Sequence, residues 1–445
     1  MVPSFVSFRA SRQALIQQSS LRGDALCRAL AAATDQWLAR LLDQAAEGNT
    51  RGLALIAVGG YGRGELFPAS DLDVVLVYEG RREVGRIADA LWYPIWDEGI
   101  SLDHSVRKPK EVLDVAAVDL RAQLGLLDGR VVAGDEAVVT PLLAQALGQW
   151  RARAGHWLPV LAEQVRERDR TQGDVAFLLE PDLKQCHGGL RDVHLMTAVA
   201  RAVEVIAEQV DIASLDAPRQ ELAAARVELH RATGRATDRL LLQEQDQVAA
   251  ALDYEDADAL MEAIAQAGRT IAWVTDDVWR RRSLWPSPTR RGRRRRARRS
   301  SRVNGPAVAM ARPVEAGVAL SGEPARADCE VVLGAEADLG GDPSLPLRIA
   351  AVAAERSLPI GRATLDLLAA QFPAPPVPWP HRLRAALVRV LIAGPSAIPA
   401  LEALDQRQLL TRLIPEWAAV RNRPQRNAYH RFTVDRHLLE AAAEA

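Results

Sequence analysis

The pattern of apolar and polar residues predicts strands and helices in the first third of the chain. Compact apolar runs, bounded by glycine and polar residues, are typical of short buried strands. Apolar residues that recur every three or four positions indicate helices that pack on one face. The predicted strands cover residues 52–58, 72–78 and 100–106, and helical spacing covers 10–47, 83–98 and 110–150. Residues 1–150 are therefore expected to form an α+β domain.

The pattern in the rest of the chain predicts mainly helices. Residues 151–285 form the second predicted domain, which is helical apart from a Gly-Gly segment at 179–194. Residues 286–302 are rich in arginine, and blocks of like charge resist packing, so an exposed linker is expected there. Residues 303–420 form a mixed and mostly helical region, and 421–445 form a last short segment.

A glycine-rich turn between the first two predicted strands carries the strongest chemical signal. It reads Gly59-Gly-Tyr-Gly-Arg-Gly-Glu-Leu-Phe-Pro-Ala-Ser-Asp-Leu-Asp73. Residues i and i+2 of a strand point to one face, with Cα atoms about 6.6 Å apart, so Asp71 and Asp73 are expected to be parallel. Two parallel carboxylates suit Mg²⁺, which binds few carboxylates and keeps its waters and substrate phosphates.

The same turn could also hold a nucleotide. Gly59 and Gly60 let backbone N–H groups approach a triphosphate, and Arg63 can add positive charge beside it. The combination predicts metal-assisted nucleotidyl transfer. The simpler interpretation is a tight turn followed by a strand with solvated aspartates.

Further candidates lie outside this turn. Asp103, on the third predicted strand, is the candidate for a third carboxylate that orients or deprotonates the nucleophile, with Asp119 and Asp128 as weaker alternatives. Lys184 and Arg191, in the Gly-Gly segment, are candidate phosphate ligands if that segment folds over the nucleotide cleft. The alternative is a turn between helices with incidental charges.

Composition excludes several classes of protein. The chain has 445 residues, 48% of them apolar, and a formal net charge of −1. This near-zero charge argues against nucleic-acid binding through overall charge, and the arginine run around Arg290–Arg299 has no interleaved aromatic residue to stack on bases. Three scattered cysteines, no secretory segment and no apolar run of membrane length predict a cytoplasmic protein that does not bind membranes.

Three segments together resemble the bacterial PII uridylyltransferase/uridylyl-removing family. They are the glycine–aspartate turn, the segment Glu180-Pro-Asp-Leu-Lys-Gln-Cys-His-Gly-Gly-Leu-Arg-Asp-Val-His194, and the run Phe432-Thr-Val-Asp-Arg-His437 after Ile414-Pro-Glu-Trp417. Asp103-His-Ser-Val-Arg107 is similar to that family's third-strand segment. The resemblance implies a DNA polymerase β-like nucleotidyltransferase domain, a helical domain and the beginning of an HD phosphohydrolase domain over 421–445.

The resemblance also implies an activity. Such enzymes move UMP from UTP to a tyrosine of the PII nitrogen-regulatory protein and release pyrophosphate. Asp71 and Asp73 would hold two Mg²⁺ ions, and Gly59 and Gly60 would contact the triphosphate. His437 would match the first metal-ligand histidine of the HD domain. Since the sequence stops at Ala445, without an HD dipeptide or the glutamine-sensing ACT domains, we expect a truncated enzyme without uridylyl-removing activity or glutamine sensing.

Four alternatives stay open. A glutamine synthetase adenylyltransferase has a similar fold and loop, although the Thr-Val-Asp-Arg-His run argues against it. A PII adenylyltransferase would use ATP, and nothing in the sequence identifies the base. A tRNA nucleotidyltransferase would place an aspartate where Gly64 stands and would present a basic surface. A non-catalytic nucleotide-binding module is the most remote, because both strand aspartates are present.

Overall fold

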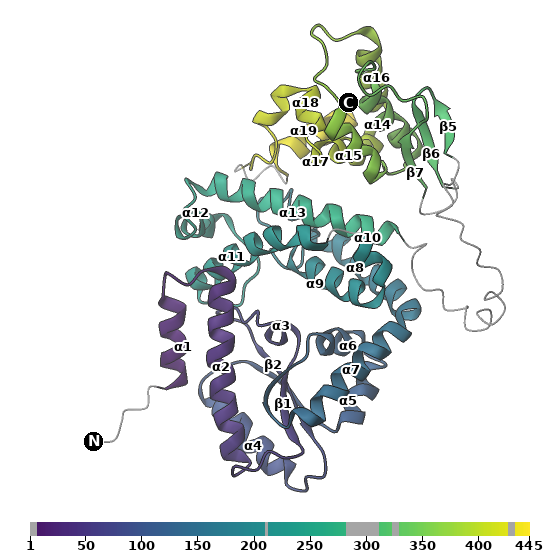
Figure 1. Ribbon diagram of the computed structural model, residues 1–445. Helices are drawn as coiled ribbons and strands as arrows, with labels where there is room; N and C mark the ends of the chain where they lie inside the picture. Colours follow the sequence, from purple (N-terminus) through teal and green to yellow (C-terminus); the bar gives the residue numbers. More distant parts are fainter. Residues whose placement is uncertain (1–6, 210–211, 282–310, 323–328, 426–431) are drawn as a thin grey trace, which may run out of the picture. The chain divides into compact units, whose positions relative to one another are not determined.

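The structure is a computed structural model that describes residues 7–209, 212–281, 311–322, 329–425 and 432–445 (Figure 1). The chain divides into two compact units. The first unit comprises Met1–Gly173 and Asp182–Leu260, and the second comprises Asp174–Pro181 and Met261–Ala445. The Arg290–Arg299 run lies outside the described residues.

A four-stranded mixed sheet organises the first unit. Its strands are β1 (Leu53–Ala57), β2 (Leu72–Tyr78), β3 (Leu102–Arg107) and β4 (Arg130–Gly134), in the order β3-β2-β1-β4. β1 is antiparallel to β2 and β4, whereas β2 is parallel to β3. All residues of β1 are buried, as expected of a central strand between two covered faces.

The three predicted strands are present, but the prediction of helix throughout 110–150 was wrong. β4 lies inside that range and pairs with β1, with a register shift between Leu55 and Ile56. The pairing joins segments far apart in sequence, so helical spacing in the flanking residues concealed it. β4 completes the sheet on the side opposite β3.

Helices surround this sheet (Figure 1). α5, α6 and α7 pack on the face that carries Ala54, Ile56 and Val77. On the other side α2 packs against α4 and β4. The helices of this unit are α1 (Phe8–Gln17), α2 (Gly23–Ala45), α3 (Gly59–Gly62), α4 (Val84–Asp97), α5 (Pro109–Ala116), α6 (Leu120–Leu127), α7 (Glu136–Ala152), α8 (Ala154–Gln172), α9 (Leu190–Ala202), α10 (Glu204–Gln209), the 3₁₀ turn Ile212–Leu215, α11 (Asp216–Thr233) and α12 (Leu242–Ala251).

The second unit is built around one buried helix. Every residue of α14 (Leu345–Arg356) from Leu345 to Ala354 is buried, and helices and a three-stranded antiparallel sheet surround it. The sheet is β5 (Arg312–Glu315), β6 (Val318–Ser321) and β7 (Glu330–Leu333), in that order. The other helices are α13 (Ala257–Arg280), which begins in the first unit, α15 (Arg362–Gln371), α16 (His381–Ile392), α17 (Ala397–Gln406), α18 (Leu409–Leu413) and α19 (Val434–Glu444), with 3₁₀ turns at Gly394–Ser396 and Pro415–Ala419.

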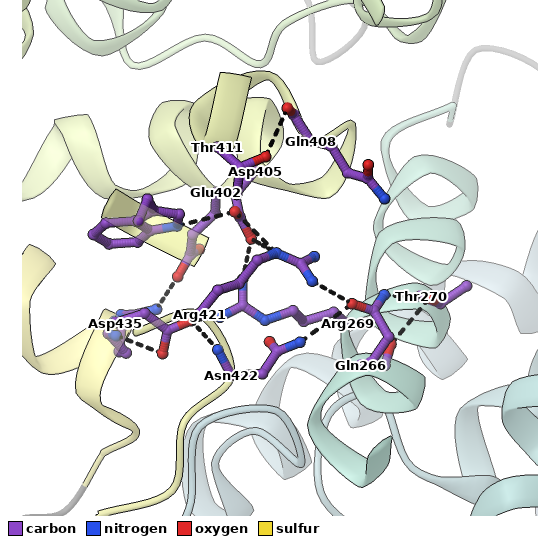
Figure 2. Close-up of polar contacts among 12 residues, drawn as sticks. Gln266, Arg269, Thr270, Glu402, Asp405, Gln408, Thr411, Arg421, Asn422 and Asp435 are labelled. Carbon is purple, nitrogen blue, oxygen red and sulfur yellow. Dashed lines mark hydrogen bonds and ion pairs between the residues drawn. The ribbon is translucent and has the colours of Figure 1, made fainter. Parts of the chain in front are cut away.

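A buried polar network connects three helices of the second unit (Figure 2). Arg269 of α13 forms ion pairs with Asp405 of α17, at 2.8 Å, and with Asp435 of α19. Arg421 makes a second ion pair with Asp405, at 3.0 Å. Asp435 also accepts a hydrogen bond from the backbone N–H of Asn422, at 2.9 Å. These contacts hold the segment before α19 against α13.

The observed units differ from the predicted domains. The predicted boundary at residue 150 falls within the first unit, where α8 continues the packing of α7. Residues 174–181, predicted to open the Gly-Gly segment, belong to the second unit, whereas Lys184 and Arg191 belong to the first. The described residues of 303–445 form one unit instead of two. The predicted boundary at 285 lies outside the described residues.

One further property of the helices concerns membranes. No individual helix in the described part of the chain combines the length and apolar composition needed to cross a bilayer. The bent pair His381–Ile392 and Gly394–Gln406, with an angle of 114° between its halves, meets those two requirements jointly.

Candidate active site

Two glycines of the glycine turn lie where there is little room for a side chain. Gly59 has φ +56°, a left-handed conformation that favours glycine, and an added Cβ would lie 3.3 Å from Asp73 Oδ2. An added Cβ at Gly62 would lie 2.2 Å from the backbone oxygen of Asp128. The short helix α3 therefore packs directly against its neighbours, and the turn brings backbone beside the Asp73 carboxylate.

The predicted carboxylates gather beside this turn. Asp71 directly precedes β2, Asp73 lies within it, and Asp73 stands opposite Asp103 in the parallel register of β2 and β3. Asp71 and Asp103 are exposed, and Asp73 is half-buried. Burial raises the pKa of Asp73, and repulsion from Asp103 and then Asp71 raises it further. The structure thus brings all three predicted carboxylates together.

A cavity of about 1380 Å³ contains these carboxylates and several cationic side chains. Lys184 and Arg191 line it, so the Gly-Gly segment contributes to the same site as the glycine turn. Lys184 Nζ lies 3.6 Å from Asp238 Oδ2. Arg191 faces the cavity, where its side chain is partly accessible and partly surrounded by protein, and no ion pair to it exists among the described residues. Burial lowers the pKa of both, and neighbouring guanidinium groups add to the effect at Arg191.

The loop that carries these cations is held rigidly. Asp182 Oδ1 accepts hydrogen bonds from the backbone N–H groups of Lys184, at 2.9 Å, and Gln185, at 2.7 Å. The Arg191 N–H donates to the Lys184 carbonyl at 3.0 Å. The buried Asp192 forms an ion pair with Arg168. Both phosphate-ligand candidates are therefore positioned before any substrate binds.

Arg63, predicted to add positive charge beside the triphosphate, lines the cavity and already has partners there. Its Nε pairs with Glu65 at 2.8 Å and its Nη1 with Asp128 at 2.6 Å, while Nη2 lies 3.2 Å from His194 Nδ1. Asp128 also pairs with Arg201 at 3.0 Å. The guanidinium group of Arg63 is thus already paired in the cavity wall. A bound triphosphate would have to compete with these partners.

The two weaker carboxylate candidates also have structural roles. Asp128 serves the ion-pair cluster just described. Asp119 caps the N-terminus of α6, accepting hydrogen bonds from the N–H groups of Arg121, at 2.8 Å, and Ala122, at 3.1 Å. These contacts favour Asp103 over both as the third carboxylate, because Asp103 lies opposite Asp73.

Arg121 was not named in the sequence analysis, and Arg107 was named only as the last residue of the segment Asp103–Arg107. Both line the cavity, Arg121 from the first turn of α6 and Arg107 from the end of β3. Neither has an ion pair within the described part of the chain, and the charge of Arg121 lowers the pKa of Asp73. No local motif marks Arg121, and the only available signal was its position after the predicted third strand. The available signal for Arg107 was the segment Asp103–Arg107, which it ends.

The metal-binding capacity of the site depends on substrate. Nowhere in the described ranges do three or more His, Cys, Asp or Glu side chains already form a metal site by themselves. Mg²⁺ does not require one, because it is usually held by one or two carboxylates together with waters and substrate phosphates. Asp71 and Asp73 meet this requirement, and the mutual repulsion that raises the pKa of Asp73 is the kind that a bound cation relieves.

Comparison with known proteins supports the resemblance. Two family models match, "Putative nucleotidyltransferase DUF294" over residues 9–95 and "GlnD PII-uridylyltransferase" over residues 160–279. A bifunctional uridylyltransferase/uridylyl-removing enzyme of Streptomyces coelicolor is 46% identical over 98% of this chain and 52% of that protein. The chain is a homologue of these bifunctional enzymes. Those of Mycobacterium tuberculosis and Corynebacterium glutamicum are 40% and 32% identical, over 92% and 88% of this chain.

The matches cover only part of the relatives, and the two family models cover only part of the candidate site. The chain spans about half the length of the curated relatives it matches, 50% of the M. tuberculosis enzyme and 53% of the C. glutamicum enzyme. The nucleotidyltransferase family model includes Asp71 and Asp73, and the uridylyltransferase family model includes Lys184 and Arg191. Asp103 lies between the two matched ranges, so its assignment depends on the strand register.

Proposed function

We propose that this chain transfers UMP from UTP to a tyrosine of the PII nitrogen-regulatory protein, with release of pyrophosphate. One observation carries the proposal. Asp73 and Asp103 stand opposite each other on parallel strands, next to Asp71, in a cavity that also contains the unpaired Arg191. The names of the relatives supply the uridylyl group, and the description of the matching family model supplies PII. UTP is the donor that we propose for this group.

The carboxylates divide the chemistry between them. Asp71 and Asp73 would hold two Mg²⁺ ions, which when bound stabilise charge on the attacking and leaving oxygens. Asp103 orients the tyrosine hydroxyl and accepts its proton at a carboxylate oxygen. Its exposure makes it accessible to a protein substrate. The tyrosine oxygen then forms a bond to the α-phosphorus as the bond to the pyrophosphate oxygen breaks.

The cations orient the nucleotide. Arg191 and Lys184, fixed by the backbone hydrogen bonds of their loop, bind the phosphates, and Arg121 adds positive charge from α6. Gly59 and Gly60 leave the backbone of the turn open to the triphosphate. Arg63 contributes indirectly, by keeping Glu65 and Asp128 in the cavity wall.

Three finer assignments rest on the same resemblance. We propose a DNA polymerase β-like fold for the nucleotidyltransferase domain of the first unit, where the carboxylates come from adjacent strands of a mixed sheet. We propose that residues 421–445, which include His437 in α19, correspond to the beginning of an HD domain. We propose a cytoplasmic location, which agrees with three buried cysteines that form no disulfide among the described residues.

The test is transfer to purified PII. The chain is incubated with PII, Mg²⁺ and either UTP or ATP, and the intact mass of PII is measured. We expect a UMP-sized increase with UTP, lost in Asp73→Asn. Asp114→Asn is the matched control, since Asp114 is an exposed carboxylate of α5 paired with Lys110. An AMP-sized increase would assign ATP instead, and no increase with either nucleotide from folded protein would refute the proposal.

A further inference from the structure

Two large aromatic side chains are exposed near the candidate active site. Tyr93 is 61% exposed and Trp96 is 45% exposed, both on α4. Their rings meet edge to face, with centroids 5.6 Å apart. Tryptophan and tyrosine side chains are enriched in protein–protein interfaces, where they provide large contact areas at a low entropic cost.

α4 presents this pair from a fixed position. The opposite side of the helix is buried through Ile87, Leu91 and Ile95. Its C-terminal end is held by Arg9, which donates hydrogen bonds to the backbone oxygens of Asp97 and Glu98, each at 3.0 Å. The exposure of Tyr93 and Trp96 is therefore a property of a packed helix and does not come from a frayed end.

His104 connects the aromatic pair to the active site. Its ring lies 5.6 Å from that of Trp96 and 4.9 Å from that of the buried Trp92. His104 also lines the cavity and follows Asp103, the proposed proton acceptor. The exposed aromatic surface is thus continuous with the site where the acceptor hydroxyl must bind.

The strand that carries Asp103 and His104 lies at the edge of the sheet. β3 pairs with β2 on one side only. On its other side, no backbone group of residues 102–107 forms a hydrogen bond with another described segment. An unpaired edge is able to accept an additional strand from another chain, with backbone hydrogen bonds giving affinity and side-chain contacts giving specificity.

We propose that Tyr93, Trp96 and the free edge of β3 form the docking surface for the acceptor protein. An extended segment of that protein pairs with β3, and a neighbouring apolar side chain packs on Tyr93 and Trp96. This arrangement places the acceptor tyrosine beside Asp103. The inference rests on the proposed function, since it assumes an acceptor that is a protein.

Steady-state kinetics test the aromatic part of this surface. Tyr93→Ala/Trp96→Ala is compared with the unchanged chain, using PII as acceptor and UTP as donor. We expect the KM for PII to rise at least tenfold, while the KM for UTP and kcat at saturating PII stay within twofold. Ile392→Ala, which removes an 80% exposed apolar side chain from α16 in the second unit, is the matched control and leaves all three values unchanged.

Hydrogen exchange tests the strand edge. Adding PII without nucleotide is expected to slow amide exchange in peptides that cover β3 and α4. If the unchanged chain transfers UMP but the double variant keeps its KM for PII, or if β3 gains no protection, the docking surface is refuted and the proposed function stands. If the unchanged chain does not modify PII, the proposed function itself fails. A dimer that the double variant dissociates without a change in KM would assign the surface to a second copy instead.

Discussion

Arg269→Met gives a strong test of the buried ion pairs in the second unit (Figure 2). The Arg269 side chain is 7% exposed, and its two carboxylate partners, Asp405 and Asp435, are 2% and 0% exposed. Removing one partner of a buried pair leaves an uncompensated charge, at a cost of about 3–5 kcal/mol. Asp405 would keep its ion pair with Arg421, so most of the cost falls on Asp435.

The free energy of unfolding should therefore fall by about 3–5 kcal/mol, a large part of the roughly 5–15 kcal/mol typical of a domain. Arg421→Met is the matched comparison. It removes one of two cations from Asp405 and should cost less, about 1.5 kcal/mol. Adding Asp435→Asn to Arg269→Met removes the unpaired charge, so the double variant should be more stable than Arg269→Met alone.

Urea denaturation followed by tryptophan fluorescence measures these differences, and Trp417 reports on the network because its indole N–H donates to Asp405 at 3.0 Å. Hydrogen exchange then shows whether the loss is confined to peptides of α13, α17 and α19. A decrease in the free energy of unfolding of less than about 1 kcal/mol for Arg269→Met would refute this reasoning, because a buried charge without a partner destabilises the fold by more than that. A double variant no more stable than Arg269→Met would do the same.

Three further outcomes are expected. Arg191→Ala should raise the KM for UTP about 10- to 100-fold, because one charge-assisted phosphate contact is lost. Arg170→Ala, which changes a 73% exposed side chain, should leave the KM for UTP unchanged. Asp73→Asn should abolish transfer without lowering the melting temperature in metal-free buffer. The pKa of the Asp73 carboxyl is raised in the folded chain, so folding opposes its charge. A large loss of stability would show a structural role instead. Burial and the charge of Arg63 lower the pKa of His194. Stability should therefore be lost as the pH falls below about 6.5, the unfolded value. Urea titrations of His194→Gln should show a weaker dependence of stability on pH below that value.

The candidate site was largely predictable because its signals are local. The glycine turn, Asp71 and Asp73 lie within fifteen consecutive residues, and the strand period alone predicts that the two carboxylates are parallel. Asp103 required one further step, the prediction of the next strand. The register of β2 and β3 in the structure supplies what that step could not, namely that Asp103 stands opposite Asp73.

Contacts between segments that are far apart along the chain could not be predicted from the sequence. Arg63 looked like a phosphate ligand, yet Asp128 and His194, far along the chain, occupy its guanidinium group. Whether a cation is free or paired depends on which carboxylates the fold brings within about 4 Å, and residue type and spacing do not encode that distance. For the same reason the sequence did not predict that Arg121 lines the cavity.

The sequence by itself determined the local elements and the order of the chemical groups along the chain. The alternation of side chains in a strand and the conformational freedom of glycine act over a few residues. Both can therefore be recognised in the sequence without knowledge of the tertiary structure. Only the tertiary structure decided that β4 completes the sheet, that residues 174–181 belong to the second unit, and that Arg269 pairs with Asp435. Each of these depends on chain closure over long separations, where the energy of packing, and not local preference, selects the partner.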